Sequence, residues 1–595
     1  MIAVESAREF KDAKDFVAVV RENVRRHGDG RSFTFVSEER GPGRRYREDE
    51  LGFAELDRRA RAVAARLNAL GLRDRAVLLL YPEGLEFLVA FLGCLYARAI
   101  AVPAPLPALD AGRADRTYGI IGDADITWIL TDEARRGMIG EWLDGAGLAE
   151  HVGRLATDTD VRDDPDGWTA PEFTPDTPAF LQYTSGSTSD PKGVIVTHGN
   201  LLYNAEEIKR RIDGSADTVG VGWVPHYHDM GLVGQFLEPL YLGCRYVFTS
   251  PITFIKRPVL WLELISRHRG TITVAPDFGY QLVLRRVTDA QLEGLDLSSL
   301  RTAKNGAEPV RADTLERMVE RFGKAGFRAG AWMPCYGMAE TTLLVTGAPL
   351  GTGAVVREFD AEALSRHEAV VRTPGKRLVS SGRPVRLDVR VVDPDTRAVL
   401  PDGRVGEIWV AGGSVARGYW RRPDRTRADF QARTADGRGP YLRTGDLGFR
   451  VDGELYITGR IKDLIIVNGH NIYAHDLEEA AMAAHPAART TAAFALDPAG
   501  SAPGAEHVVI VQEFAAAAAG ERSPDELAAL TRDTVARAFG LTAVSVVLAG
   551  RGAVRRTTSG KIQRPLTRED FLEGRIRRLG GDLDPAAAAP RRAGT

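Results

Sequence analysis

AVLLLYPEGLEFLVAFLGCLYARA, residues 76–99, decides the class of fold. It opens with five apolar residues, passes through the turn formers Pro82 and Gly84, and continues as an amphipathic segment of helical length. A short apolar run that ends at a turn is typical of a buried strand, and the segment after it predicts a helix. One strand followed at once by one helix is the repeating unit of a layered α/β fold.

The same alternation continues on both sides of this segment. Residues 1–30 predict a helical lead-in, residues 32–39 a strand, and residues 44–72 a second strand followed by an amphipathic helix. Further strands, each with a helical segment after it, are predicted in DITWILTDEA (125–134), DTVGVGWVP (217–225), GCRYVFTS (243–250) and TITVAPD (271–277). The pattern predicts mainly parallel sheets that are buried between helices.

The pattern of predicted secondary structure changes near residue 380. Shorter β-rich pieces follow at residues 387–396, 405–413 and 441–460, and Asp-Gly pairs predict hairpin turns at Asp402-Gly403 and Asp452-Gly453. After Gly459 the chain resumes a compact α+β pattern.

The sequence therefore predicts two domains. A large domain, residues 1–459, holds two layered α/β sheets and a small β-rich subdomain. A small, mobile α+β domain, residues 460–580, follows it, and residues 581–595 form a flexible tail.

Composition excludes several classes of protein. The chain has 595 residues, 44% of them hydrophobic and 27% charged, which is globular composition. Lys and Arg number 78 and Asp and Glu number 80, so the net charge of −2 draws the protein neither to nucleic acid nor to an anionic membrane. Any phosphate group must be held by local charges. The three cysteines are far apart and lack metal-binding spacing, which favours a reducing compartment.

The N-terminal sequence lacks the basic start and apolar run of a secretory signal. The most apolar stretch, residues 87–97, has about half of the roughly 20 residues that a membrane-spanning helix needs. We expect a soluble cytoplasmic protein without a membrane span.

The segment YTSGSTSDPKG, Tyr183–Gly193, carries the strongest chemical signal. It places five hydroxyl side chains, two glycines and Lys192 directly after an apolar strand end. Glycines let backbone N–H groups close around phosphate oxygens, and hydroxyls and a lysine add further donors. The spacing differs from a Walker A loop. Taken alone, the segment would also suit a flexible Ser/Gly surface loop.

This segment resembles the phosphate-binding signature of the adenylate-forming superfamily, which comprises acyl-CoA synthetases, nonribosomal peptide adenylation domains and luciferases. Further motifs stand in the family's order and at its usual distances: YGMAET (336–341), YLRTGDLG (441–448), GRIKDLIIVNGHNIYAHDLE (459–478) and TTSGKIQR (557–564). The resemblance covers essentially the whole chain. It implies an enzyme that uses ATP and Mg²⁺ to convert a carboxylate into an acyl-adenylate.

The resemblance also implies a nucleotide site. Tyr336 corresponds to the aromatic residue that stacks on adenine, Glu340 to the carboxylate that holds Mg²⁺, and Asp446 to the acceptor of the ribose hydroxyls. Without the other motifs, Glu340 would be an ordinary solvated acid and Asp446 a turn aspartate. The remaining nucleotide-binding residues that the match implies are Thr184, Ser185, Gly186, Ser187, Thr188, Lys192, Gly306, Ala307, Glu308, Gly337, Met338, Thr341 and Arg460.

Three further roles follow from the resemblance. Lys561 corresponds to the catalytic lysine of the adenylation step, and Lys462 and Asp463 correspond to the hinge about which the small domain swings. His228, with Asp229, matches the segment beside the carboxylate and acyl pocket; a positioning role and a purely structural role both stay open. A surface lysine is the alternative for Lys561.

Several stretches are closer to the fatty acyl-AMP ligases than to CoA synthetases. These are residues 78–107, 181–204, 223–243 and 250–282. About 30 extra residues, at about 350–378, match an insertion that in this group hinders the domain arrangement used with free CoA; a tolerated surface loop is the alternative. Pro225-His226, Asn468-Gly469-His470 and Ala474 depart from the group's pattern. Of these, His226 and the turn Asn468-Gly469-His470 leave the acyl and acceptor preferences open.

The expected reaction joins a fatty acid to AMP, releases pyrophosphate, and passes the acyl group to the phosphopantetheine thiol of an acyl carrier protein in polyketide or nonribosomal peptide biosynthesis. The acyl chain would lie in an apolar tunnel lined partly by Trp223. A fatty acyl-CoA synthetase is the first alternative. A catalytically inactive homologue that binds nucleotide or acyl-adenylate is the second, and the intact Lys561, Glu340 and Asp446 argue against it.

Overall fold

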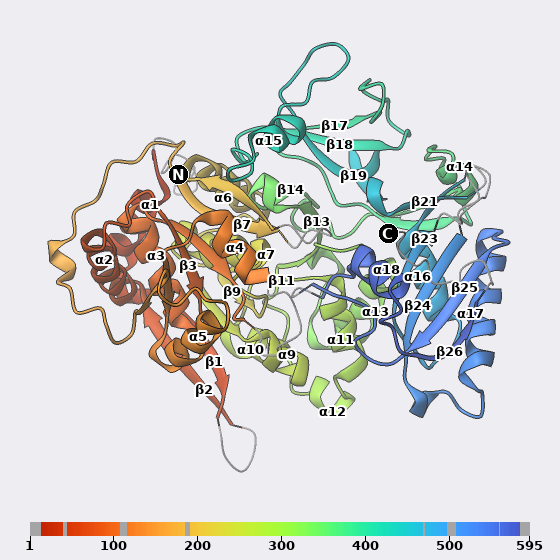
Figure 1. The fold of residues 1–595 in the computed structure, drawn as a ribbon, viewed down its shortest axis with the longest axis horizontal. Helices are drawn as coiled ribbons and strands as arrows, with labels where there is room; N and C mark the ends of the chain where they lie inside the picture. Colours follow the sequence, from red (N-terminus) through yellow and green to blue (C-terminus); the bar gives the residue numbers. More distant parts are fainter. Residues whose placement is uncertain are drawn as a thin grey trace.

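The computed structural model describes residues 13–39, 45–107, 116–184, 191–467, 470–496, 507–557 and 560–583. Figure 1 shows the N-terminal α/β layers on one side, a β-rich unit above the centre and the C-terminal elements on the other side. The fold class predicted from the sequence is confirmed: the structure has a large N-terminal part with two α/β sheets and a small C-terminal α+β part. Residues 1–12 of the expected lead-in lie outside the described residues.

An eight-stranded sheet forms the centre of the large part, in the order β14-β13-β12-β11-β9-β10-β1-β2. Its inner strands are parallel, and β2 and β14 pair antiparallel at the edges. Its strands are β1 Ser32–Glu38, β2 Tyr46–Gly52, β9 Val219–Gly222, β10 Arg245–Thr249, β11 Ile272–Ala275, β12 Thr302–Asn305, β13 Trp332–Gly337 and β14 Leu344–Gly347.

Both faces of this sheet are buried, which explains why its central strands are short apolar runs. Along β10, Val247 faces a core that contains residues of α10, α11 and α13, whereas Tyr246 and Phe248 face a core that contains residues of α6 and α8. These helices are α6 His198–Ile212, α8 Glu238–Leu242, α10 Val259–His268, α11 Asp277–Arg286 and α13 Ala312–Phe322.

A six-stranded sheet lies beside the first, in the order β6-β5-β3-β4-β7-β8. Only β7 and β8 pair antiparallel, and the segment Tyr183–Gly193 spans the connection between them. The elements are β3 Ala76–Leu80, β4 Ile100–Ala104, β5 Trp128–Thr131, β6 Gly153–Ala156, β7 Pro178–Thr184, β8 Lys192–Thr197, α1 Phe16–His27, α2 Phe53–Ala69, α3 Leu85–Ala97, α4 Arg116–Ala124 and α5 Glu133–Gly145.

Helix α3 connects the cores of the two sheets. It contacts β3 and β4 of the smaller sheet, β1 of the larger sheet, and α2 along much of its length. Its residues from Phe87 to Ala97 are all buried. A helix that is enclosed on all sides is apolar all round, so the apolar stretch that the sequence shows here is a core helix. Within the described residues, every helix is too short or too polar to span a bilayer.

The β-rich unit is an antiparallel sheet of β17 Asp388–Val392, β18 Gly406–Ala411, β19 Leu442–Val451 and β20 Glu454–Arg460. The turn at Asp452-Gly453 is confirmed, because both residues have the positive φ of a two-residue hairpin, 52° and 79°. The prediction of a hairpin turn at Asp402-Gly403 is wrong. The connection between β17 and β18 runs from residue 393 to 405 and folds onto itself through a bridge between Val392 and Val399, so these two residues turn the chain within a longer loop.

The segment 350–378, predicted as an insertion, forms a small unit of its own beside this sheet. It contains β15 Val356–Phe359 and α14 Ala361–Ser365 and reaches into β16 Lys376–Val379, which pairs antiparallel with β15. Helix α15 Pro423–Phe430 follows β18.

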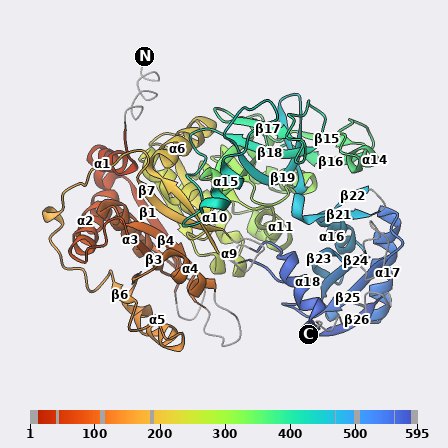
Figure 2. The same cartoon turned by 45° about the horizontal axis from the view of Figure 1, so that its top comes forward.

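The C-terminal elements pack around their own sheet, in the order β23-β24-β25-β26, and Figure 2 shows them on one side of the molecule. Leu477, Ile510, Val535 and Val546 belong to its separate core. The position of the boundary at residues 459 and 460 stays a prediction. The elements are β21 Leu464–Val467, β22 His470–Tyr473, α16 Ala474–Ala483, β23 Ala488–Leu496, β24 His507–Phe514, α17 Pro524–Phe539, β25 Val544–Ala549, α18 Arg564–Leu572 and β26 Arg578–Asp582.

Two glycine substitutions test the packing of α3. A Cβ at Gly93 would overlap the side chain of Val63 on α2, whereas a Cβ at Gly137 on α5 would meet open space. We expect Gly93→Ala to lower the free energy of unfolding by about 1–3 kcal/mol through overpacking. Gly137→Ala serves as the matched control and should raise it by about 0.5–1 kcal/mol, because alanine loses less entropy in a helix. Denaturant unfolding of both variants measures the difference, and equal effects would contradict the packing of α2 on α3.

Candidate functional site

A cavity of about 2380 Å³ lies between the large part and the C-terminal elements. Its walls come from both α/β sheets, from β19 and β20, and from the C-terminal elements. The predicted site residues that line it are Thr184, Lys192, His228, Ala307, Glu308, Tyr336, Gly337, Met338, Glu340, Asp446, Arg460, Lys462, Asp463 and Lys561. Ser185, Gly186, Ser187 and Thr188 lie outside the described residues.

The carboxylate of Asp446 binds two of the other predicted residues. Tyr336 donates its hydroxyl to Oδ2 at 2.7 Å, and Arg460 donates Nε to Oδ1 at 2.8 Å. The register of the β19–β20 hairpin places Asp446 directly opposite Arg460, while Tyr336 comes from β13 of the large sheet. The Tyr336 ring is thereby fixed at the cavity wall. Asp446 raises the pKa of the Arg460 guanidinium, which stays charged.

Glu340 sits beside an aromatic residue that the sequence reasoning missed. Tyr419 donates its hydroxyl to Glu340 Oε1 at 3.0 Å, and the Lys192 ammonium lies 5.6 Å from the centre of the Tyr419 ring. The backbone around Tyr419 is held to β8, because Trp420 N–H donates to Gly193 O at 2.8 Å. Burial raises the pKa of Glu340. Nothing local in the sequence marks Tyr419, because its role depends on a contact across 79 residues.

Close backbone packing shapes the turn after β13. A Cβ at Gly337 would overlap the carbonyl oxygen of Leu343, and Met338 N–H donates to that same oxygen at 2.9 Å. Thr341 is fully buried and donates its hydroxyl to Met338 O at 2.9 Å, so it holds the turn in shape behind the cavity wall.

Gly306 plays a similar part between β12 and β13, because a Cβ there would lie 2.7 Å from Cys335 O. The next residue, Ala307, lines the cavity with a positive φ of 68°. Gly306 and Thr341 therefore shape the backbone behind the cavity wall. The other described residues predicted for the nucleotide site line the cavity itself.

His228 and Asp229 form a pair at the cavity wall, with Nδ1 and Oδ1 separated by 2.6 Å. Asp229 also accepts the N–H of Met230 at 2.7 Å. Burial opposes ionisation of Asp229, yet His228 and Lys561 outweigh it and hold its pKa at about 2. The carboxylate is therefore charged at neutral pH and orients His228.

Lys561 reaches the cavity from the C-terminal elements. Its N–H donates to Thr557 Oγ1 at 3.1 Å, and a Cβ added at Gly560 would lie 3.7 Å from the ring of Phe278 on α11. Burial and the nearby Arg460 lower the pKa of the Lys561 ammonium, whereas Asp229 and Glu308 raise it. The pKa of Lys561 therefore depends on charged groups that lie more than 100 residues away in sequence.

The predicted hinge residues form a single short turn, Ile461–Asp463. Asp463 accepts Nη1 of Arg564 at 2.9 Å, and the same guanidinium binds both oxygens of Glu478, at 2.7 and 2.8 Å. The turn is thus tied to the C-terminal elements. Arg564 is the last residue of the predicted motif at residues 557–564, but its ion pairs could not be read from that motif.

An apolar part of the cavity begins beyond His228. Trp223 stacks on Phe254 with ring centres 3.8 Å apart, and Met230 and Leu343 add apolar lining. Trp223 thus lines the cavity, as expected, and the cavity has both polar and apolar lining.

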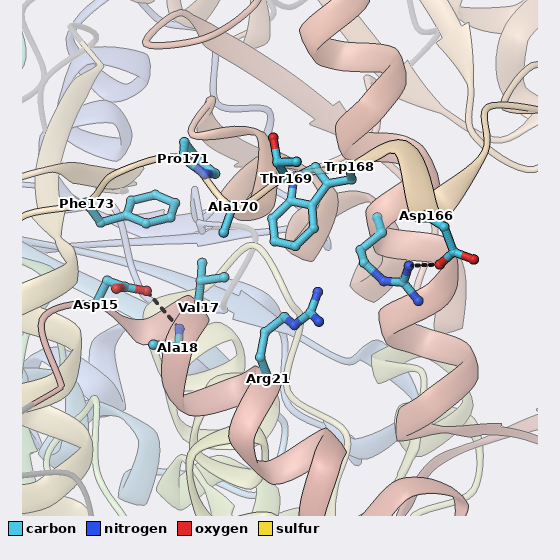
Figure 3. A pocket seen from close by; sticks show the side chains of 11 residues that line it. Asp15, Val17, Ala18, Arg21, Asp166, Trp168, Thr169, Ala170, Pro171 and Phe173 are labelled. Carbon is cyan, nitrogen blue, oxygen red and sulfur yellow. Dashed lines mark hydrogen bonds and ion pairs between the residues drawn. The ribbon is translucent and has the colours of Figure 1, made fainter.

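A second, smaller pocket of about 590 Å³ lies near the start of α1 (Figure 3) and contains none of the predicted residues. Its charged groups are already engaged. Arg61 pairs with Asp166 and Asp57, and Arg21 lies over the Trp168 ring at 5.1 Å. The large cavity is therefore the candidate active site.

Comparison with known proteins identifies the family of the chain. The profile of the family described as AMP-binding enzyme matches residues 20–420. The chain is 42% identical over 541 residues to the medium-chain-fatty-acid–[acyl-carrier-protein] ligase JamA of Moorena producens, covering 89% of this chain and 91% of that protein. It is 36% identical over 550 residues to a 4-hydroxyphenylalkanoate adenylyltransferase of Mycobacterium marinum, covering 89% and 87%.

Solved structures give the same grouping. The fatty acyl-adenylate ligase from L. pneumophila in complex with acyl adenylate and pyrophosphate is 35% identical, with a TM-score of 0.74 over 98% of this chain and all of that chain. A fatty acyl-adenylate ligase from a study of the E. coli and L. pneumophila enzymes is 30% identical, with a TM-score of 0.82 over 95% and 98%. The chain therefore belongs to the AMP-binding enzyme family and, within that family, to the fatty acyl-AMP ligases.

Proposed function

We propose that this protein activates the carboxylate of a fatty acid with ATP and then passes the acyl group to the phosphopantetheine thiol of an acyl carrier protein. The observation that carries the proposal is the position of Lys561, which the C-terminal elements bring into one cavity with Asp446, Glu340 and an apolar lining. The relatives whose names describe fatty acid–carrier protein ligases support the same reaction.

In the first step, an oxygen of the fatty acid carboxylate bonds to the α-phosphorus of ATP, and the bond from that phosphorus to the pyrophosphate oxygen breaks. Two negatively charged reactants must approach each other, so cations at the site lower the barrier. Lys561 and Arg460 would bind the oxygens at the α-phosphorus, and Lys192 would bind the outer phosphates. Tyr336 and Asp446 would hold the adenosine, so that the reactants meet in a fixed orientation.

Mg²⁺ fits this site through Glu340. The described residues contain no group of three or more His, Cys, Asp or Glu side chains that could hold a metal. A single carboxylate suits Mg²⁺ when substrate phosphates supply the other ligands. Bound there, the ion would neutralise phosphate charge, while Tyr419 orients the Glu340 carboxylate through its hydrogen bond.

The second step depends on the contact between the segment 350–378 and the C-terminal elements. Lys376, within this segment, forms an ion pair with Asp476 of α16 and lies over the Tyr473 ring at 5.7 Å. Asn471 Nδ2 of β22 donates to Ser365 O of the segment at 3.0 Å. These contacts favour the present orientation of the C-terminal elements over a rotation about Lys462-Asp463. They support a carrier protein as acceptor in place of free CoA.

Removal of the Lys561 ammonium tests the proposed reaction. Lys561→Ala should slow formation of acyl-adenylate at least about 100-fold, because it removes a charge that stabilises the transition state. ATP–pyrophosphate exchange with decanoate measures this step. Lys324→Ala, at an exposed lysine remote from the cavity, is the control and should match the wild type. Equal rates for the two variants would contradict the assignment of Lys561.

Glu340→Gln tests the metal site. The amide keeps the shape but loses the charge, so the variant should need at least about tenfold more Mg²⁺ for half-maximal exchange. Tyr419→Phe is the matched control, since it removes only the neighbouring hydroxyl and should change the Mg²⁺ requirement less than threefold. An unchanged Mg²⁺ requirement in Glu340→Gln would place the metal elsewhere.

Lys376→Ala tests the choice of acceptor. The wild type should transfer the acyl group to a holo-acyl carrier protein while acyl-adenylate accumulates with free CoA. Loss of one partly buried ion pair shifts the orientation equilibrium by about 1 kcal/mol, so CoA thioester formation should rise several-fold. Arg372→Ala, which breaks the ion pair with Asp360 inside the same segment, is the control. Rapid thioester formation by the wild type would identify a CoA synthetase instead.

A further inference from the structure

Helix α9, Pro251–Lys256, presents two large apolar side chains at the surface. Ile252 is 63% exposed and Ile255 is 49% exposed, whereas Phe254 is fully buried and stacks on Trp223 in the cavity wall. The buried ring fixes the helix, and the spacing of three residues places both isoleucines on the same side of it. Neighbouring apolar side chains that stay exposed are typical of a surface that another molecule covers.

Cations without acidic partners lie beside these isoleucines. Lys256 ends α9, and Arg286 at the end of α11, which lies next to α9 (Figure 1), donates Nη1 to Ile255 O at 3.0 Å. Arg285 precedes it in the last turn of α11. Among the described residues, no carboxylate oxygen lies within 4.0 Å of the charged nitrogen atoms of these three side chains. A positive surface therefore exists here, although the whole chain carries a net charge of −2.

This surface borders the mouth of the large cavity. Ile255, Arg285 and Arg286 are exposed and also line the cavity. On the opposite side of the mouth, Met482 and Arg489 of the C-terminal elements are exposed and line the same cavity, and Arg489 has no acidic partner in the part of the chain that the structure describes. We call the following residues the basic rim: Ile252, Ile255, Lys256, Arg285, Arg286 and Arg489.

Helix α11 connects the basic rim to the reaction site. Its first turn lies beside the loop of Lys561, because a Cβ added at Gly560 would lie 3.7 Å from the Phe278 ring. Its last turn carries Arg285 and Arg286. A helix of ten residues is about 15 Å long, so the basic rim lies about one helix length from that loop. A phosphopantetheine arm is long enough to span this path.

We propose that the basic rim docks the carrier protein through an acidic face beside its phosphopantetheine arm. The cations would pair with carboxylates of that face, the isoleucines would be covered by its apolar side chains, and the arm would follow α11 into the cavity. The inference rests on the proposed function and adds the surface at which its acceptor binds. An anionic membrane is the competing occupant. A carrier protein is favoured because the second step requires a thiol to enter at the mouth that the rim borders.

Reversal of two charges tests the docking surface. Lys256→Glu/Arg285→Glu alters the rim and keeps Arg286, whose hydrogen bond holds α9. The acceptors are a type II holo-acyl carrier protein with an acidic face and free pantetheine, which lacks the protein. The double variant should raise KM for the carrier protein at least about tenfold, because like charges then meet. ATP–pyrophosphate exchange with decanoate and transfer to pantetheine should stay within about twofold of the wild type, which reports a folded protein.

Two controls separate docking from a general effect of charge. Arg73→Glu/Lys324→Glu makes the same change in net charge at exposed cations that do not line the cavity, and it should keep the wild-type KM. A carrier protein whose acidic face is changed to lysines should be a poor acceptor for the wild type. It should regain transfer with Lys256→Glu/Arg285→Glu, because the reversed charges again attract.

The outcomes separate the inference from the proposed function. If the wild type exchanges no pyrophosphate with decanoate, or loads only free CoA, the proposed function fails and the inference fails with it. If the wild type loads the carrier protein and the double variant has an unchanged KM for it, the inference alone is overturned. Loss of transfer to pantetheine in the double variant would place the rim in the reaction itself and would also overturn the inference.

Co-sedimentation with phosphatidylglycerol vesicles tests the competing occupant. The wild type and the double variant should sediment equally. If the wild type binds the vesicles, the double variant does not, and KM for the carrier protein is unchanged, the rim is a lipid-binding surface and the inference is overturned.

Discussion

The hydrogen bonds of the Asp446 carboxylate connect the parts of this protein that must act together. One oxygen holds Tyr336 from the large sheet, and the other holds Arg460 at the end of the β-rich unit. Three residues after Arg460, Asp463 is bound by Arg564 of the C-terminal elements. A short series of charged contacts thus runs from the central sheet to the element that carries Lys561. Any change in the position of Asp446 would move the nucleotide wall and the hinge turn together.

Charge in the cavity is local, as the balanced composition requires. Lys192, Arg460, Lys462 and Lys561 line the same space, although the whole chain carries a net charge of −2. In a partly enclosed cavity these charges act on phosphate more strongly than they would at the open surface, because less water screens them. A cluster of cations that serves one ligand therefore needs no overall positive charge.

Preferences for the acyl chain and for the acceptor depend on different parts of the molecule. Trp223, Met230 and Leu343 line the cavity from the large part, and they would act on the acyl chain. The contacts around Lys376 lie at the junction with the C-terminal elements, and they would act on the second step. Because the two regions share no residues, changes in one preference should leave the other nearly unaltered.

The sequence by itself determined the local structure and the chemistry of the motifs. Apolar runs followed by amphipathic segments predicted the strands and helices of both sheets, since burial sets those periods. Asp452-Gly453 was predicted as a turn because both residues tolerate a positive φ. Asp402-Gly403 carries the same signal, but a bridge elsewhere in its loop decided the outcome.

Only the tertiary structure decided which distant side chains meet. Thr341 belongs to a motif, yet it is turned away from the cavity to hold a backbone turn. Tyr419 stands in no predicted motif, and the motif that ends at Arg564 does not reveal the partners of its guanidinium. Both residues bind side chains 79 or more residues away, and these contacts arise when helices and sheets bury their apolar faces. Side-chain periodicity records which face of an element is buried, but not which other element covers it.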